Sequence, residues 1–272
     1  MNPNWLGIVA FVLALLLFFL VYRSAKKKPL KIRVPLTVLA IVASIPGASL
    51  AAYYAHVIPE ASWYYQFRSL PGSEFSVIVL GVTGALIATL LPRILLIFPL
   101  LGVAAFSLAP FVKPLVGPLS IDEMKDEWRD NVCLQSTPST CGAASTATVL
   151  NYLGASTKES DLAIEAHSYQ SGTEAWYLAR VARSRGFDAS FDFQSGFLPE
   201  GGLPAVVGVK FGSFGHFIAI LAQTGDRFIV GDPLRGREEL SQEELEGRYL
   251  FTGFHMRVRS PRGTGCDLKD FF

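Results

Sequence analysis

Four long apolar segments occupy the first 112 residues and are separated by short polar stretches. They run from 5 to 22, 34 to 54, 75 to 91 and 94 to 112. Each is about as long as a helix must be to cross a hydrocarbon core of about 30 Å. The first lacks the preceding basic residues and the small-residue cleavage site of a secretory signal, so we expect it to be retained as an anchor. The pattern predicts an all-α transmembrane region of about four helices within residues 1–117.

The loops between these segments differ in charge. Six Lys or Arg residues lie between Arg23 and Arg33, whereas the loop before residue 75 contains one, Arg68. Basic loops stay in the cytoplasm, so four spans place everything after residue 112 outside the cytoplasm, and three spans reverse that side. The number of membrane spans depends on Pro92 and Arg93. These residues separate either the two arms of a helical hairpin or the two halves of one broken helix. We expect four spans and an extracytoplasmic second half.

After residue 117 the sequence becomes polar, and we assign residues 118–272 to a second domain. Helices are predicted at 141–153, 156–167 and 174–185, the second with Ser156 and Glu159 as a capping box. Runs rich in β-branched and aromatic residues then predict strands. These strands are 189–193, 203–211, 216–223, 226–233 and 251–259, with a helix capped by Ser241 and Glu244 before the last. Helices followed by strands are typical of an α+β domain.

Composition agrees with this division. Half of the 272 residues are apolar, which is too many for one ordinary soluble domain. Residues 1–118 hold nine basic and two acidic residues, whereas 119–272 hold fifteen basic and twenty-one acidic residues. The acidic second half excludes a nucleic-acid partner, which requires a basic face. The sequence contains no G-x-x-x-x-G-K-[ST] phosphate loop, so we do not expect nucleotide-driven transport.

Candidate chemistry centres on Cys141, which opens the first predicted helix of the second domain. The positive end of a helix favours the thiolate, the nucleophilic form of cysteine. A cysteine nucleophile also needs a histidine and a group that orients it. His216 opens one strand and Asp232 ends the next, so a short turn between antiparallel strands places them side by side. The side chain of Gln135 and the backbone N–H of Cys141 could donate to an oxyanion.

Other reactive residues have simpler interpretations. His56 lies at a membrane boundary, His167 in a polar helix and His255 within the last strand, and we interpret His255 and Trp176 as structural. Cys133 and Cys266 are either buried thiols or, outside the cytoplasm, partners in a disulfide. No Cys and His spacing suits a tetrahedral zinc site, so we expect no metal.

The motifs together resemble a known family. QSTPSTCGAAS, then LNYLG, then GHFIAI and VGDP are similar to the papain-like cysteine peptidases that process double-glycine leaders of bacteriocin precursors. The resemblance covers roughly residues 130 to 259, and Gly172 with Thr173 also fits the family's pattern. It implies a papain-like α+β fold, a Cys141–His216–Asp232 triad and an oxyanion hole that includes Gln135.

The resemblance also implies an activity. We expect a membrane-anchored cysteine peptidase, in a bacterial inner or cytoplasmic membrane, that needs no cofactor. Its expected substrates are peptide or protein segments presented near the lipid bilayer and cut after small residues such as glycine. A membrane partner protein is also expected. Two alternatives remain open: an acyl or amide transferase on the same triad, and a non-catalytic domain that binds leader peptides.

Overall fold

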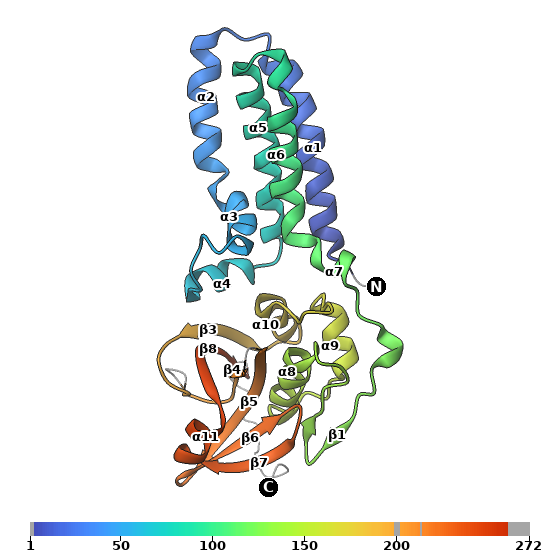
Figure 1. Cartoon of the computed structure of the whole chain (residues 1–272), viewed down its shortest axis with the longest axis vertical. Coiled ribbons are helices and arrows are strands. Elements are labelled where there is room, and N and C mark those ends of the chain that lie inside the picture. Colours follow the sequence, from blue (N-terminus) through green and yellow to red (C-terminus); the bar gives the residue numbers. More distant parts are fainter. Residues whose placement is uncertain (1–2, 199–201, 213, 261–272) are drawn as a thin grey trace. The chain divides into compact units, whose positions relative to one another are not determined.

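The computed structural model describes residues 3–198, 202–212 and 214–260, and these form two compact units (Figure 1). One unit consists of apolar helices from residues 3–59 and 71–116. The other contains residues from Gly117 onward together with Glu60–Leu70, a segment that lies between two membrane-length helices in the sequence. The second unit therefore combines two parts of the chain that are separated by 46 residues.

The helical unit contains the predicted apolar segments. Its helices are α1 (Trp5–Ala25), α2 (Leu30–Ala43), α3 (Ile45–Tyr54), α5 (Ile78–Leu90), α6 (Ile97–Leu108) and the short α7 (Lys113–Val116). By length and composition, three helices with their flanking turns could cross a membrane: Trp5–Ala25, Ser73–Leu90 and Arg93–Phe111. The pair α2 and α3, bent by 51°, makes a fourth candidate. The predicted segment 34–54 is thus two helices, broken near Ser44.

Small residues allow these helices to pack closely. A Cβ atom on Gly81 of α5 would lie 2.0 Å from the carbonyl oxygen of Ala14 on α1. A Cβ atom on Gly84 would lie 2.3 Å from Cγ2 of Val103 on α6. Close packing through small residues is the usual way in which membrane helices associate. Because α5 packs against α6, Pro92 and Arg93 connect the arms of a helical hairpin.

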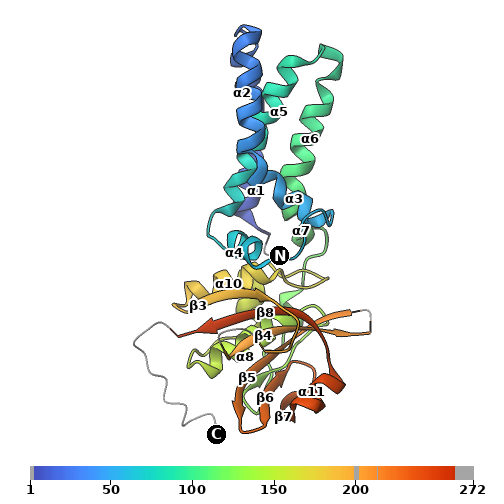
Figure 2. The ribbon, with the colours of Figure 1, turned by 90° about the vertical axis from the view of Figure 1, so that its left-hand side faces the viewer.

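The second unit is built on one antiparallel sheet (Figure 2). The strands are β3 (Asp188–Phe193), β4 (Ala205–Phe211), β5 (Phe214–Thr224), β6 (Arg227–Asp232), β7 (Gly236–Ser241) and β8 (Leu250–Arg259), in the order β3-β8-β4-β5-β6-β7. The helices are α4 (Ser62–Arg68), α8 (Cys141–Tyr152), α9 (Glu159–Glu165), α10 (Ala175–Ser184) and α11 (Gln242–Arg248). A two-stranded ribbon, β1 (Trp128–Arg129) and β2 (Val132–Cys133), precedes α8. The α+β prediction is confirmed.

Two local predictions had different outcomes. The capping box of Ser241 and Glu244 is present at the start of α11. The predicted box of Ser156 and Glu159 is wrong, because α9 begins at Glu159 itself and has no side-chain cap. The carboxylate of Glu159 instead accepts hydrogen bonds from Ser136, 23 residues earlier. Strand β7 was not predicted, because its sequence, GREELS, is polar and charged.

The segment Glu60–Leu70 packs through aromatic and arginine side chains. The ring of Tyr65 on α4 lies 5.2 Å from Trp176 on α10 and 4.9 Å from Phe193 on β3. Arg68 is 1% exposed, and its guanidinium lies 4.3 Å from the Trp176 ring. Arg180 of α10 donates a 2.7 Å hydrogen bond to the carbonyl oxygen of Arg68. Stacking and hydrogen bonds thus hold α4 against α10 and β3.

Candidate active site

Cys141 is the first residue of α8 and is 8% exposed. The next residue allows this position to approach the sheet. A Cβ atom on Gly142 would lie 3.0 Å from Cδ1 of Leu178 and 3.3 Å from Cδ2 of Phe217. One turn later, Ser145 donates a 2.9 Å hydrogen bond to the carbonyl oxygen of Phe217. The start of α8 is therefore fixed beside the residue that follows His216 in β5.

His216 and Asp232 meet across two paired strands. β5 and β6 are antiparallel, with Ala219 opposite Gly231. Nε2 of His216 lies 2.9 Å from Oδ1 of Asp232, and the Asp232 side chain is fully buried. With Nε2 directed to the carboxylate, Nδ1 is the ring nitrogen left for Cys141, which lies near enough to raise the pKa of His216. The predicted neighbourhood of Cys141, His216 and Asp232 is present.

The electrostatics of the site favour a protonated imidazole. Burial alone would lower the pKa of His216, but the hydrogen bond to Asp232 and the nearby Cys141 outweigh it and raise the pKa to about 9. Burial alone would raise the pKa of Asp232, yet hydrogen bonds from His216, the Leu234 N–H and the Tyr249 hydroxyl lower it. At neutral pH the carboxylate is therefore ionised, and the imidazole holds a proton.

A tyrosine completes the surroundings of the carboxylate. The hydroxyl of Tyr249, which follows α11, donates a 2.8 Å hydrogen bond to Oδ2 of Asp232. The Tyr249 ring lies 5.9 Å from the ring of Phe211, which lies 5.4 Å from the imidazole of His216. Both carboxylate oxygens of Asp232 thus have donors, and an aromatic wall flanks His216. Sequence reasoning missed Tyr249, since nothing in its local sequence indicates its partner.

Gln135 lies in the loop before α8 and is tied to the end of β6. Its backbone N–H donates a 3.0 Å hydrogen bond to the carbonyl oxygen of Pro233, the residue after Asp232. Its side-chain Nε2 donates to the carbonyl oxygen of Thr137 at 2.8 Å, and Nε2 carries a second hydrogen. Oε1 is buried without a hydrogen-bond partner among the described residues. The structure therefore places Gln135 in the loop that leads to Cys141.

The carboxylate of Glu159 binds the same loop. Its side chain is fully buried. One carboxylate oxygen accepts a 2.8 Å hydrogen bond from the N–H of Ser136, and the other accepts from the Ser136 hydroxyl. Ser136 directly follows Gln135, so this two-point contact fixes the backbone next to Gln135. Sequence analysis identified Glu159 only as a capping residue. Its partner, Ser136, is 23 residues away, so local spacing could not predict the contact.

Comparison with known proteins identifies the family. The family model described as "Peptidase C39 family" matches residues 129–260. An uncharacterized protein of Methanothermobacter thermautotrophicus is 31% identical over 137 residues, which cover 50% of this chain and 90% of that protein. The chain belongs to the Peptidase C39 family. Its C39 domain is a cysteine peptidase, as predicted.

Other known proteins are similar to about half of this chain. A second uncharacterized protein, from Methanothermobacter marburgensis, is 28% identical over 136 residues, with 50% of this chain and 93% of that protein covered. A double glycine motif protease from an AMS/PCAT transporter, solved in complex with the leader peptide, is 24% identical with a TM-score of 0.42, covering 51% of this chain and 95% of that one. The peptidase domain of Streptococcus ComA is 19% identical with a TM-score of 0.41, covering 49% and 100%.

The remaining candidate residues lie outside this group of side chains. His255 is fully buried in β8, and burial lowers its pKa, so it is a neutral core histidine as predicted. Trp176 is buried under Arg68 and Tyr65. Cys133 is fully buried; burial first, and the nearby Glu159 second, raise its pKa and keep it a thiol. Cys266, the other cysteine of the possible disulfide, lies outside the described residues.

Two further expectations concern the loop near α10 and metal binding. Gly172 has a φ of +128°, a conformation that suits glycine, and the Thr173 hydroxyl lies 2.6 Å from that of Ser168. Thr173 also packs near Gly142, since a Cβ atom there would lie 3.6 Å from the Thr173 Cβ. Within the described part of the chain, no group of three or more His, Cys, Asp or Glu side chains could hold a metal ion.

Proposed function

We propose that Cys141, His216 and Asp232 form the catalytic triad of this C39 peptidase. The observation that carries the proposal is the position of His216, which is hydrogen bonded to Asp232 through Nε2 and lies near enough to Cys141 for that residue to raise its pKa. Asp232 orients the imidazole and favours its protonated form, so His216 can hold the proton of the attacking thiol. Cys141 is the first residue of α8, where the positive end of the helix stabilises negative charge that develops on a neighbouring atom.

The reaction then follows from the proton on His216. The Cys141 sulfur attacks the peptide carbonyl carbon, and the carbonyl electrons move to oxygen to form a tetrahedral intermediate. When the C–N bond breaks, the imidazolium donates its proton to the leaving amine, and a thioester remains on Cys141. His216 next takes a proton from a water molecule that attacks the thioester, and this proton returns to the site as the carboxylic acid leaves. Asp232 stays ionised throughout.

We propose Gln135 and the Cys141 backbone N–H as the donors that stabilise the oxyanion. One hydrogen of Gln135 Nε2 is bonded to the Thr137 carbonyl oxygen, which leaves the other available to a substrate oxygen. The N–H of Cys141 is at the first turn of α8, where backbone donors lack intrahelical acceptors. Donors held in place before the reaction contribute much of the stabilisation of such intermediates.

We further propose that the helical unit anchors the peptidase in a membrane, with its active site outside the cytoplasm. Nδ2 of Asn4 donates a 3.1 Å hydrogen bond to Glu74, so α1 and the α5 arm begin at the same end of the bundle. Because both run in the same direction, the bent pair α2–α3 must return the chain between them. This connectivity supports four membrane crossings. The hairpin of α5 and α6 then brings the chain back across the membrane, so that Gly117 is on the same side of it as Glu60–Leu70. The basic loop from Arg23 to Arg33 lies at the opposite end, the cytoplasmic one.

Membership of the C39 family supports a peptide substrate. We propose peptide or protein segments presented near the bilayer, with cleavage after small residues such as glycine, as the sequence resemblance implies. A membrane partner protein that delivers such a segment is part of the same proposal.

The test is active-site labelling of the full chain with peptide chloromethylketones that end in glycine or in a bulkier residue. We expect modification of Cys141 and not of Cys133, which is fully buried and serves as the internal control. Modification of Cys133 alone would overturn the triad. Cys141→Ala should abolish product formation, and unchanged processing would favour a binding domain. An amide product in the presence of an added amine, in place of the acid, would favour the transferase.

A further inference from the structure

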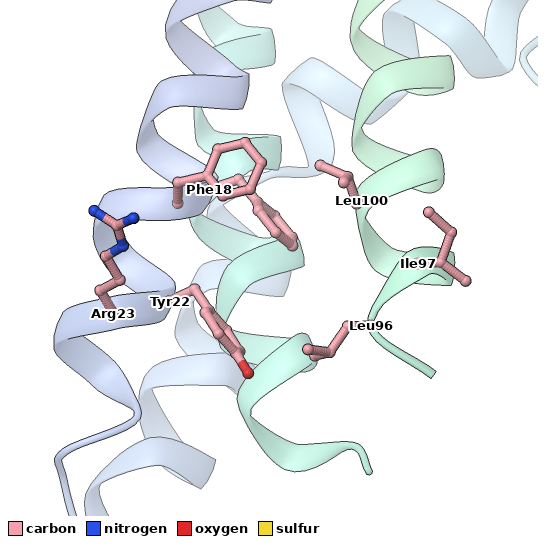
Figure 3. A pocket seen from close by; sticks show the side chains of 7 residues that line it. Phe18, Tyr22, Arg23, Leu96, Ile97 and Leu100 are labelled. Atoms are coloured by element: carbon pink, nitrogen blue, oxygen red, sulfur yellow. The ribbon is translucent and has the colours of Figure 1, made fainter. Parts of the chain in front are cut away.

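The helical unit contains an apolar cavity between α1 and α6 (Figure 3). Its volume is about 370 Å³, which lies within the range of about 300–1,000 Å³ usual for small-molecule sites. It is lined by Phe18, Phe19, Tyr22 and Arg23 from α1 and by Leu96, Ile97 and Leu100 from the α6 arm. Figure 3 shows Phe18 and Tyr22 opposite Leu100 and Leu96. Apart from Arg23 and the Tyr22 hydroxyl, this lining is hydrocarbon.

A cluster of positive charge lies at the same end of the helical unit as this cavity. The loop that joins α1 to α2 and the one that joins α5 to α6 lie at this end (Figure 1). The guanidinium of Arg33, at the start of α2, donates to the carbonyl oxygen of Thr89 near the end of α5. The basic residues of the two loops are Arg23, Lys26, Lys27, Lys28, Lys31, Arg33 and Arg93.

These cations have no carboxylate partner among the described residues. The only acidic residue within 3–59 and 71–116 is Glu74, and it is hydrogen bonded to Asn4 at the opposite end of α1. One cation is directly connected with the cavity: Nζ of Lys26 donates a 3.1 Å hydrogen bond to the hydroxyl of Tyr22 and lies 5.2 Å from its ring. The cavity is thus apolar inside and positively charged at its end.

We propose that this cavity binds an anionic phospholipid. An acyl chain lies against Phe18 and Leu100, and the phosphate is bound at the basic end by Lys26. The combination of an apolar channel with uncompensated cations matches a molecule that is hydrocarbon at one end and anionic at the other. This inference rests on the proposed membrane anchoring, since the site would face the lipid of the cytoplasmic leaflet.

Charge complementarity selects this occupant over a second copy of the chain. A copy that inserted an identical helix end would bring a second set of these cations into the same place, without carboxylates to balance them. A zwitterionic lipid would fill the apolar part equally well but carries an ammonium group that the basic cluster repels. The expected signature is therefore a preference for net negative headgroups.

The test is native mass spectrometry of the purified full chain in detergent, titrated with phosphatidylglycerol or with phosphatidylcholine of the same acyl chains. We expect one phosphatidylglycerol per chain, bound at least tenfold more tightly. The variant Lys26→Gln should lose about fivefold in affinity for phosphatidylglycerol, as expected for the loss of one charge. Leu100→Trp, which fills the cavity, should weaken both lipids.

Matched controls separate this site from general effects. Lys113→Gln removes a charge from α7, away from the two basic loops, and Leu101→Trp enlarges a residue of α6 that does not line the cavity. Neither should change the affinity. Equal affinity for both lipids, or equal loss in the control variants, would overturn the proposal, as would a dimer that excludes lipid. A chain recovered in the aqueous fraction after carbonate extraction would instead overturn membrane anchoring, and labelling of Cys141 tests the triad independently.

Discussion

The hydroxyl of Tyr249 donates a 2.8 Å hydrogen bond to Oδ2 of Asp232, while Oδ1 of the same carboxylate lies 2.9 Å from His216. The two donors approach from different directions, so the carboxylate plane is fixed, and the imidazole is aligned with it. Tyr249 is 2% exposed and cannot be replaced by a solvent molecule. It acts as a positioning residue through Asp232.

Tyr249→Phe should lower kcat/KM about tenfold, because a hydrogen bond to a charged group is worth about 1.5–3 kcal/mol and only part of it bears on the transition state. The pKa of Asp232 should rise when this donor is lost, so the acidic limb of the pH–rate profile should move to higher pH. Tyr169→Phe is the matched control, since it removes a tyrosine hydrogen bond to a different carboxylate, that of Glu174. An unchanged acidic limb in Tyr249→Phe would contradict this role.

The pH dependence follows from the raised pKa of His216. Its folded value of about 9 exceeds the usual value of about 6.5, so the protonated pair stabilises the fold fully below pH about 6.5. That stabilisation is lost as pH rises through about 9. Because the imidazolium must donate a proton to the leaving amine, kcat/KM should fall with a midpoint near pH 9. Initial rates between pH 5 and 10 measure this midpoint, and a basic limb centred near 6.5 would contradict the assignment.

Gln135→Ala should reduce kcat by about 10²- to 10³-fold with little change in KM, since the lost donor acts on the oxyanion. Because the side-chain Nε2 also donates to the carbonyl oxygen of Thr137, the thermal midpoint should be recorded in parallel. The exposed Gln223, whose side chain donates to the carbonyl oxygen of Gly225 in its own turn, provides the matched control Gln223→Ala. A rise in KM alone would show that Gln135 binds substrate without stabilising the oxyanion.

Glu159→Gln should lower kcat through the loop that it fixes. The amide oxygen can accept from one Ser136 donor, whereas its NH2 group can only donate to the Ser136 hydroxyl, so two hydrogen bonds to a charged acceptor become weaker neutral ones. We expect a loss of about 1–3 kcal/mol in the free energy of unfolding and a lower kcat. Glu165→Gln, on the exposed face of the same helix, removes only a surface ion pair with Arg185 and should change neither. Loss of stability with unchanged kcat would make Glu159 structural only.

Arg68→Ala should destabilise the peptidase unit, although Arg68 belongs to a loop between apolar helices. The change removes a buried guanidinium that stacks on Trp176, and it leaves a cavity under α4. We expect a drop of several degrees in the melting temperature of the full chain. Arg185→Ala, at a surface ion pair, is the control. Equal melting temperatures for the two variants would show that α4 contributes nothing to the stability of the unit.

The parts of the site that the sequence predicted are those carried by local signals. Cys141 is at the start of a helix and is followed by small residues. His216 is near the start of one strand and Asp232 is at the end of the next, and the short turn between these antiparallel strands places the two residues side by side. Tyr249 and Glu159 could not be predicted, because each contacts its partner across 17 or 23 residues without a pattern of its own. β7 was missed because its residues are polar and charged, unlike those of a typical strand. The break near Ser44 was missed because the apolar composition continues across it.

The packing of α4 has a consequence for engineering. The peptidase unit is discontinuous in sequence: Ser62–Arg68 and the residues from Gly117 contribute to one fold, and α5 and α6 are inserted between them. No single cut in the chain separates the catalytic part from the helical part. A chimera that exchanges one anchor for another must graft Glu60–Leu70 along with the enzyme, or leave Trp176 and its aromatic neighbours uncovered.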